Sequence, residues 1–395
     1  MRLSDRAQRA NTSPTLALDA RTKELQAKGE DIISFAVGEP DFDTPEHVKE
    51  AATQAIAGGF TKYTPTNGIP ELRKAIVDKL CRENGLSYQP GEVIVSVGAK
   101  HSLYNAVMAL CDPADEVLIP SPYWVSYPEM VKLAGATPVM VPPDKGLKVT
   151  PGQIAGRLTA RSKGIILNSP ANPTGAVYSR QELEQLAELI VEHDLWVISD
   201  EIYEHLVYDG NEHVSMASLG PEIKERTVVV NGVSKAFAMT GWRIGYAAGP
   251  VGVIQAMGKV QIHATSNPTS ISQHAAVAAL TGPMDTVWSM REEFDRRRRY
   301  MTQRLQELDG FSCQLPQGAF YVFCNISPLL GRCYRGQPIT SDEELAELIL
   351  TQAHLAVVPG SGFGVGDHLR FSYATSLSRI EEGLEWLASW LEELE

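Results

Sequence analysis

The stretch VVVNGVSKAFAMTGWRIGYAAGP, residues Val228–Pro250, begins with an apolar run and continues with small residues, one lysine and one arginine. The apolar run predicts a buried strand, and ligands of open α/β sheets gather where such strands end. Lys235 lies at that end between Ser234 and Ala236, and Arg243 follows in a segment framed by two glycines. A lysine that only faces solvent does not need small neighbours. The stretch therefore predicts an α/β sheet with a chemically active lysine at its edge.

Strand-like and helix-like segments alternate around this stretch. The apolar runs that predict strands are residues 92–99, 116–120, 163–170, 196–203 and 227–234. Because short apolar strands joined by amphipathic helices are typical of parallel sheets, we expect an α/β fold with a mostly parallel sheet in a large α/β/α domain. From residue 286 onward a long helix, isolated strands and a last helix predict a smaller α+β domain. We expect the large domain to span residues 45–285 and the small one residues 1–44 and 286–395, so that the N-terminal segment packs with the C-terminal part.

Composition and charge argue against several classes of protein. The chain has 395 residues and a formal net charge of −13, which disfavours nucleic acid as a partner. No apolar run approaches the ~18 residues of a membrane span, and the polar first residues do not resemble a signal peptide, so we expect a cytoplasmic protein. Five scattered cysteines without a C-x-x-C motif predict reduced thiols and no metal site. The basic run Arg296–Arg299 lies in a long helical pattern and predicts a solvated, ion-paired helix surface.

Residues at another predicted strand end complement Lys235. A lysine amine forms a Schiff base with an aldehyde, which is how proteins hold pyridoxal phosphate. The phosphate then needs backbone N–H groups at the start of a helix, together with a cation. Gly98 and Ala99 offer the N–H groups, and Arg243 with the hydroxyl of Ser234 offers the rest. Each feature alone is common in loops, but their joint occurrence indicates a site for a phosphate-bearing cofactor.

The ring of such a cofactor requires three further kinds of contact. A carboxylate keeps the ring nitrogen protonated, and Asp200 after the run WVIS fits that role. Hydrogen-bond donors must face the phenolate oxygen of the ring, and Asn172 in NPTG and Tyr203 fit. Trp124 in SPYWVSYPE offers an aromatic face to the ring. Alone, such an aspartate is often a helix cap and such a tryptophan a core residue, whereas the full set in this order indicates a pyridoxal phosphate site.

Six motifs, in this order along the chain, carry a family resemblance. They are YTPTNGIPELR, SPYWVSYPEM, NPTGAVY, SDEIYEHL, GVSKAFAMTGWRIG and LRFSYA. They resemble the class I pyridoxal-phosphate-dependent aminotransferases of fold type I over nearly the whole chain. The nearest resemblance is to the bacterial-type aspartate aminotransferases, including relatives that also use prephenate. It implies the two-domain fold of that family and a homodimer with active sites at the subunit boundary.

The resemblance also implies roles for individual residues. Catalysis would fall to Lys235, Asp200 and Tyr203, and cofactor binding to Gly98, Ala99, Lys100, Trp124, Asn172, Ser234 and Arg243. Tyr63 would reach the phosphate in the other subunit. Arg370 would bind the α-carboxylate of the substrate, assisted by Asn172, Trp124 and the backbone of Gly38. One branch of the family neutralises the second carboxylate with an arginine shortly before SNP, but QIHATSNPTS lacks it. We therefore expect Lys100 and Thr15 to take that part.

The reaction implied is ping-pong transamination of aspartate and 2-oxoglutarate to oxaloacetate and glutamate, with prephenate left open as a further acceptor. Another main substrate (prephenate, an aromatic amino acid or alanine) remains an alternative, as does lyase or synthase chemistry on the same fold. A non-catalytic binding module is disfavoured by the complete catalytic set. A nicotinamide-dependent oxidoreductase is disfavoured because VVPGSGFGVGDHLR does not read G-x-G-x-x-G and leads into a predicted strand.

Overall fold

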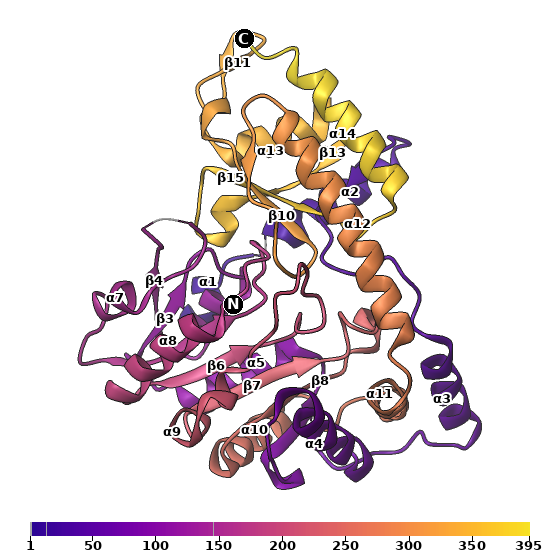
Figure 1. Cartoon of the computed structure of the whole chain (residues 1–395), viewed down its shortest axis with the longest axis vertical. Coiled ribbons are helices and arrows are strands. Elements are labelled where there is room, and N and C mark those ends of the chain that lie inside the picture. The colour runs from indigo at the N-terminus through magenta and orange to yellow at the C-terminus, as the bar shows by residue number, and fades with distance from the viewer. Residues whose placement is uncertain (1, 13, 145) are drawn as a thin grey trace.

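A seven-stranded sheet forms the centre of the larger part of the molecule (Figure 1). The computed structural model describes residues 2–12, 14–144 and 146–395. The strands are β2 (Val93–Ser96), β3 (Glu116–Pro120), β4 (Thr137–Val141), β5 (Ser162–Asn168), β6 (Trp196–Asp200), β7 (Thr227–Gly232) and β8 (Gly245–Ala248). Their order is β2-β8-β7-β6-β5-β3-β4, and β8 runs antiparallel to both of its neighbours while the other pairs are parallel. The predicted mostly parallel α/β sheet is confirmed.

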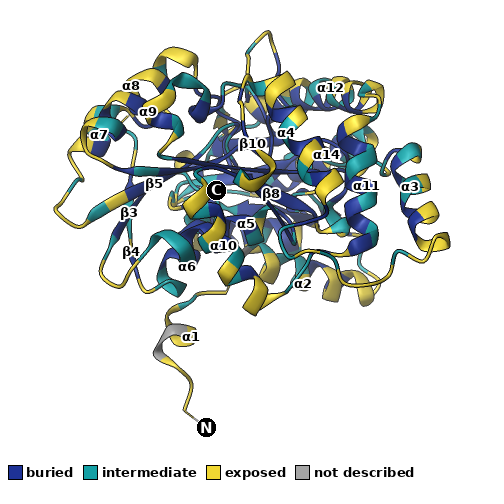
Figure 2. Cartoon of the chain, turned by 90° about the horizontal axis from the view of Figure 1, so that it is seen from below, coloured by how far each residue is buried: buried dark blue, intermediate teal, exposed yellow. Residues whose placement is uncertain are grey.

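Helices bury both faces of this sheet because its strands are continuous apolar runs, whose successive side chains point to opposite faces. Ile198 of β6 packs against the helices on one face, whereas its neighbour Val197 packs against those on the other. The first face is covered by α5 (Ala99–Leu110), α6 (Ser126–Leu133) and α10 (Val251–Ala264). The second is covered by α4 (Pro70–Asn84), α8 (Arg180–Glu192), α9 (Pro221–Lys224) and α11 (Ser270–Thr281). Two further helices pack on these, α3 (Glu46–Ala57) against α11 and α7 (Pro151–Ala155) against α8. The exposed residues of these helices face outward (Figure 2). Within the described ranges, no helix is both long enough and apolar enough to cross a membrane.

A smaller antiparallel sheet lies in the C-terminal part of the chain. Its order is β14-β15-β10-β9, and its strands are β9 (Ser312–Cys313), β10 (Tyr321–Asn325), β14 (Val358–Pro359) and β15 (His368–Ser372). The helices of this part are α12 (Asp285–Glu307), α13 (Asp342–Gln352) and α14 (Leu377–Leu391), with a short ribbon of β11 (Cys333–Tyr334) and β12 (Gln337–Pro338). In Figure 1 the long α12 runs from the large sheet up to the small one.

The N-terminal segment joins the C-terminal part. It contains α1 (Asp5–Arg9), α2 (Pro14–Ala27) and β1 (Ile33–Ser34), and β1 pairs in parallel with β13 (Leu355–Ala356). Phe35 is fully buried in the C-terminal core, and its carbonyl accepts a 2.8 Å hydrogen bond from the amide of Ser372. This pairing carries the chain directly on to Gly38, at the boundary between the two sheets.

The basic run on α12 is only partly solvated. Arg296 and Arg299 have exposed side chains, but Arg297 is 5% exposed and Arg298 is fully buried. Arg297 binds Asp41 at 2.7 Å, and Arg298 donates to the carbonyl of Pro316. The expected solvated surface is therefore wrong for the two middle arginines, because segments distant in sequence cover that side of the helix. The expected ion pairing is confirmed, and it ties α12 to the segment that follows Gly38.

Candidate active site

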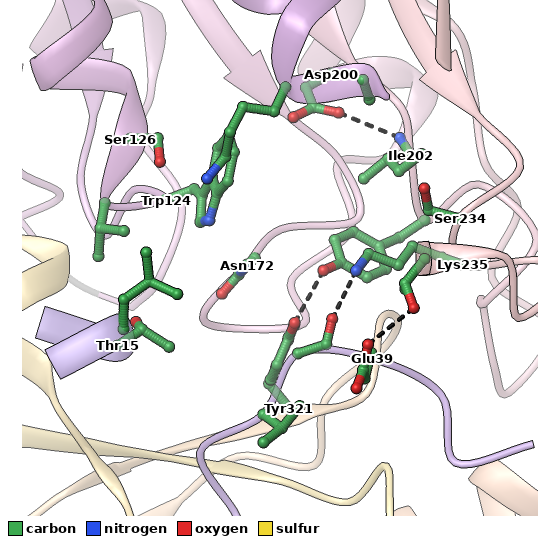
Figure 3. A pocket seen from close by; sticks show the side chains of 18 of the residues that line it. Thr15, Glu39, Trp124, Ser126, Asn172, Asp200, Ile202, Ser234, Lys235 and Tyr321 are labelled. Atoms are coloured by element: carbon green, nitrogen blue, oxygen red, sulfur yellow. Dashed lines mark hydrogen bonds between the residues drawn. The ribbon is translucent and has the colours of Figure 1, made fainter. Parts of the chain in front are cut away.

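A cavity of about 520 Å³ opens where the parallel strands of the large sheet end. Tyr321 of β10 and Arg370 of β15 line it from the small sheet, and Thr15 lines it from α2. Figure 3 shows Thr15 and Tyr321 around the cavity. All but two of the predicted site residues line this cavity. They are Thr15, Gly38, Ala99, Lys100, Trp124, Asn172, Asp200, Tyr203, Ser234, Lys235, Arg243 and Arg370. The structure thus brings together residues that lie as far apart in the chain as Thr15 and Arg370.

The two exceptions lie in different places. Gly98 immediately precedes α5 beside the cavity, and a Cβ atom there would come within 2.3 Å of a guanidinium nitrogen of Arg243. Its φ of +84° also disfavours any side chain, so both sterics and backbone geometry favour glycine. Tyr63 lies outside the cavity and is 92% exposed. Its assignment to a neighbouring subunit remains a prediction.

The start of α5 forms a cradle suited to an anion. Because β8 is antiparallel, it begins beside the carboxyl end of β2, and Ser96 pairs with Gly245. That reversal places Arg243 next to the first turn of α5, where its guanidinium donates to the carbonyls of Thr240 and Val97. Helix N-termini with a nearby cation bind phosphate groups well. Ser234 and the N-terminus of α5 line the same cavity as Arg243, so the geometry can hold a phosphate there.

Lys235 carries its amine into the middle of the cavity. Its Nζ donates a 2.6 Å hydrogen bond to the carbonyl of Gly38, across the boundary between the two sheets (Figure 3). Burial lowers the pKa of Lys235 to about 8, and Arg243 and Arg370 act in the same direction while Glu39 opposes them. A lysine with this pKa has far more neutral amine near pH 7 than a solvated one. The neutral amine is the nucleophilic form, which suits attack on an aldehyde.

Asp200 ends β6 as a buried carboxylate. Tyr127 donates to its Oδ2 at 2.7 Å, and the amide of Ile202 donates to its Oδ1 at 3.3 Å. Burial raises the pKa of Asp200 to about 6, although these two hydrogen bonds favour the ionised form. A cation placed against this carboxylate would stabilise its charge further. Asp200 can therefore hold a protonated ring nitrogen.

Arg370 presents a buried guanidinium from the small sheet. One nitrogen donates to the side-chain oxygen of Asn172 at 3.0 Å and another to the carbonyl of Ala36 at 2.6 Å. The guanidinium lies 4.4 Å from the ring centre of Tyr321, and its buried Nε has no partner among the described residues. Burial lowers the pKa of Arg370 from its usual value, but arginine stays charged in proteins. A guanidinium that is held in place and still has an N–H without a partner is suited to bind a carboxylate.

Lys100, in the first turn of α5, is a further cation of the cavity. The amine of Lys100 is 4.8 Å from the ring centre of Trp124, and burial followed by the charge of Arg243 lowers the pKa of Lys100. Thr15 approaches this side from α2 (Figure 3). Lys100 and Arg370 thus bring positive charge to the cavity from two different elements, α5 and β15.

Sequence reasoning missed three residues that the structure adds. Tyr127 binds Asp200, and the hydroxyls of Tyr203 and Tyr321 lie 2.9 Å apart. Asn168 donates to the carbonyl of Asp200, and its side-chain oxygen accepts from the amide of Asn172. Asn168 is the last residue of β5, so the rule that located Asp200 could have found it too.

Comparisons with known proteins agree with this geometry. Residues 30–387 match the family model described as aminotransferase class I and II. The chain is 49% identical to the aspartate aminotransferase of Geobacillus stearothermophilus, covering 99% of each chain. It is 50% identical to the aspartate/prephenate aminotransferase of Cereibacter sphaeroides, covering 96% of each.

Solved structures show the same likeness. The fold matches the crystal structure of the aspartate aminotransferase from Rhizobium meliloti with a TM-score of 0.97 and 46% identity over 100% of both chains. It also matches the aspartate aminotransferase from Thermus thermophilus with maleate, with a TM-score of 0.93 and 48% identity over 98% of this chain and 100% of that one. The likeness therefore extends over both sheets and the segment between them.

Proposed function

The chain belongs to the class I and II aminotransferases, and we propose on that basis that it is a pyridoxal-phosphate-dependent aspartate aminotransferase. It would convert aspartate and 2-oxoglutarate to oxaloacetate and glutamate in two half-reactions. The observation that supports this proposal most strongly is that three groups from different elements line one cavity. They are the amine of Lys235, the carboxylate of Asp200 and the guanidinium of Arg370. The free cysteines agree with a reducing compartment, and we place the enzyme in the cytoplasm.

The donor set of the cavity fits pyridoxal phosphate. The start of α5, Arg243 and Ser234 suit the phosphate, and the close approach of Gly98 to Arg243 leaves no room there for a side chain. Asp200 suits the ring nitrogen, Tyr203 and Asn172 the ring oxygen, and Trp124 a ring face. When bound, the cofactor supplies an aldehyde for the amino group and a ring that accepts electrons from the substrate's α-carbon.

Lys235 performs the proton transfers. Its depressed pKa provides a neutral amine, which would hold the cofactor and, when free, could accept the proton from the substrate's α-carbon. The 2.6 Å bond to the carbonyl of Gly38 shows that the amine reaches across the cavity toward the segment between the sheets. Asp200 keeps the ring nitrogen protonated, and Tyr127 and Ile202 hold its carboxylate in place.

Two cations recognise the substrate. Arg370, oriented by Asn172 and Ala36, binds the α-carboxylate through its planar fork. Lys100, with Thr15, binds the second carboxylate of aspartate or glutamate. The likeness to a relative from Thermus thermophilus with maleate, a dicarboxylate, supports this assignment. Removing water around these groups strengthens both interactions.

We further propose a homodimer with shared active sites, in which Tyr63 serves the cofactor phosphate of the neighbouring subunit. The proposed large domain spans residues 45–285, and residues 1–44 and 286–395 form the small one. Prephenate is a second candidate acceptor, because a relative named aspartate/prephenate aminotransferase is 50% identical.

The test uses half-reaction spectra of the purified holoenzyme. Aspartate and glutamate are each expected to bleach the visible band of the lysine-bound cofactor, and oxaloacetate or 2-oxoglutarate to restore it. Recovery with prephenate would add the second activity. Spectra that do not change with any amino acid, or turnover that needs no keto acid, would contradict transamination.

A further inference from the structure

The loop that carries Tyr63 is held by buried polar side chains of two neighbouring helices. It connects α3 with α4, and Tyr63 projects from it with 92% of its surface exposed. Ser270, at the start of α11, donates from its hydroxyl to the carbonyl of Phe60 at 3.0 Å. Exposed loops are commonly mobile, but this one is fixed from its buried side.

Gln273 of α11 makes the most direct contacts with this loop. Its side-chain oxygen accepts a 2.8 Å hydrogen bond from the amide of Ile69, and its nitrogen donates to the hydroxyl of Thr64 at 3.0 Å and to the carbonyl of Pro268 at 2.9 Å. The side chain is fully buried. Thr64 is the neighbour of Tyr63, so Gln273 fixes the chain within one residue of the exposed phenol.

Gln261 of α10 binds the same loop and the strand that leads to the phosphate cradle. Its nitrogen donates to the carbonyl of Thr66 at 2.7 Å and to that of Val95 at 2.8 Å. Its oxygen accepts from the hydroxyl of Ser96 and from the side-chain nitrogen of Asn105. Gln261 is also fully buried, with both polar atoms satisfied. Buried amides keep such partners because an unpaired polar group in the interior is costly.

We propose that Gln273 and Gln261, together with Ser270, are positioning residues that hold the Tyr63 loop in the conformation in which its phenol binds the cofactor phosphate of the partner subunit. The inference rests on the proposed function, which assigns Tyr63 to the shared site. A loop that is already ordered before the cofactor binds loses less conformational entropy on binding, so affinity for the cofactor rises. Neither glutamine needs to touch the cofactor.

The test is a double-mutant cycle on the dimeric apoprotein, with the dissociation constant for pyridoxal phosphate measured by absorbance titration. Gln273→Met keeps the length of the side chain and removes its hydrogen bonds. It is expected to raise the dissociation constant about tenfold, the scale of one or two lost buried hydrogen bonds. In a Tyr63→Phe background the same change should have less than about a twofold effect. Gln303→Met, on the exposed part of α12, is the control and should leave binding unchanged.

Hydrogen exchange supplies a second readout that does not depend on the cofactor. The amide of Ile69 donates to Gln273, so its exchange in the apoprotein should become at least about tenfold faster in Gln273→Met. An equal rise of the dissociation constant in both backgrounds, or none at all, would overturn the positioning role. A Tyr63→Phe variant with unchanged affinity would instead refute the shared site itself.

A folding defect would not end the test. Should Gln273→Met fail to fold, Ser270→Ala removes a single bond to the loop and should show the same dependence on Tyr63, with about a two- to threefold effect. An effect of Ser270→Ala that is the same with and without the Tyr63 hydroxyl would count against the proposal.

Discussion

The hydroxyl of Tyr127 donates a 2.7 Å hydrogen bond to Oδ2 of Asp200, and both side chains are buried. Tyr127 lies on α6 and Asp200 at the end of β6, so the bond joins a helix on the face of the sheet to the edge of that sheet. Burial alone pushes this carboxyl toward its neutral form, and the tyrosine acts against that tendency.

Tyr127→Phe should therefore raise the pKa of Asp200 above its value of about 6. A hydrogen bond to a charged group contributes about 1.5–3 kcal/mol, which corresponds to a rise of about one unit or more. The carbon resonance of the labelled carboxyl group in the apoprotein reports the midpoint directly, and the acidic limb of kcat/KM should move to higher pH. An unchanged midpoint would show that Tyr127 does not support the charge.

Asp200→Asn should stabilise the apoprotein while it removes activity. A carboxyl with a pKa near 6 in the folded state and 3.8 as its reference value is more readily protonated when folded, so its stabilising effect is full below pH 3.8 and is lost as pH rises through 6. Asparagine stays neutral and avoids that loss. Urea unfolding should show a gain of about 2–3 kcal/mol at pH 8 that shrinks toward pH 4. A gain that does not vary with pH would contradict this origin.

The sequence predicts the site residues at the carboxyl edge of the sheet better than it predicts the side chains that hold those residues in place. Asp200 and Lys235 follow short apolar runs, and such runs identify strand ends without any tertiary knowledge. No comparable signal marks Tyr127 and Tyr321, because each lies in an apolar segment whose pattern predicts a core residue as well as a site residue. The bond between Tyr203 and Tyr321 joins positions 118 residues apart, and only the folded chain reveals it. The burial of Arg297 and Arg298 depends on contacts of the same long-range kind, with Asp41 and Pro316, which the helical pattern alone does not predict.

Lys235 should react with amine reagents at a lower pH than an ordinary lysine. Its pKa of about 8 predicts that labelling of the apoprotein rises through pH 8, whereas a free lysine side chain follows a pKa of about 10.4. Peptide mapping of trace labelling measures this, with the exposed Lys163 as an internal comparison. Borohydride reduction of the holoenzyme should then place the cofactor on Lys235. A label on another lysine would refute the assignment.

Hybrid dimers test the shared site. A Tyr63→Ala chain keeps its lysine, and a Lys235→Ala chain keeps its tyrosine, so a mixed dimer contains one site with both residues intact. Activity should return after the two inactive variants exchange subunits, up to half of the wild-type value per mixed dimer. Mixing each variant with itself is the control. Confirmed exchange without any recovery would place both residues in the same chain's site.

Lys100→Ala should discriminate between acidic and neutral substrates. Its amine lies 4.8 Å from the ring centre of Trp124, and Lys100 lines the same cavity as Arg370 from a different element, so we expect it to bind the second carboxylate of aspartate. Truncating one member of a buried charge pair costs about 2 kcal/mol or more, so kcat/KM for aspartate should fall about 30-fold. The value for alanine, which lacks that carboxylate, should change little. Steady-state assays with both amino donors decide the matter, and Thr15→Val should show the same selectivity with a smaller loss. An equal fall of kcat/KM for both amino donors would indicate that Lys100 contacts the cofactor instead of the substrate. A preference for dicarboxylic substrates would then require another cation in the cavity.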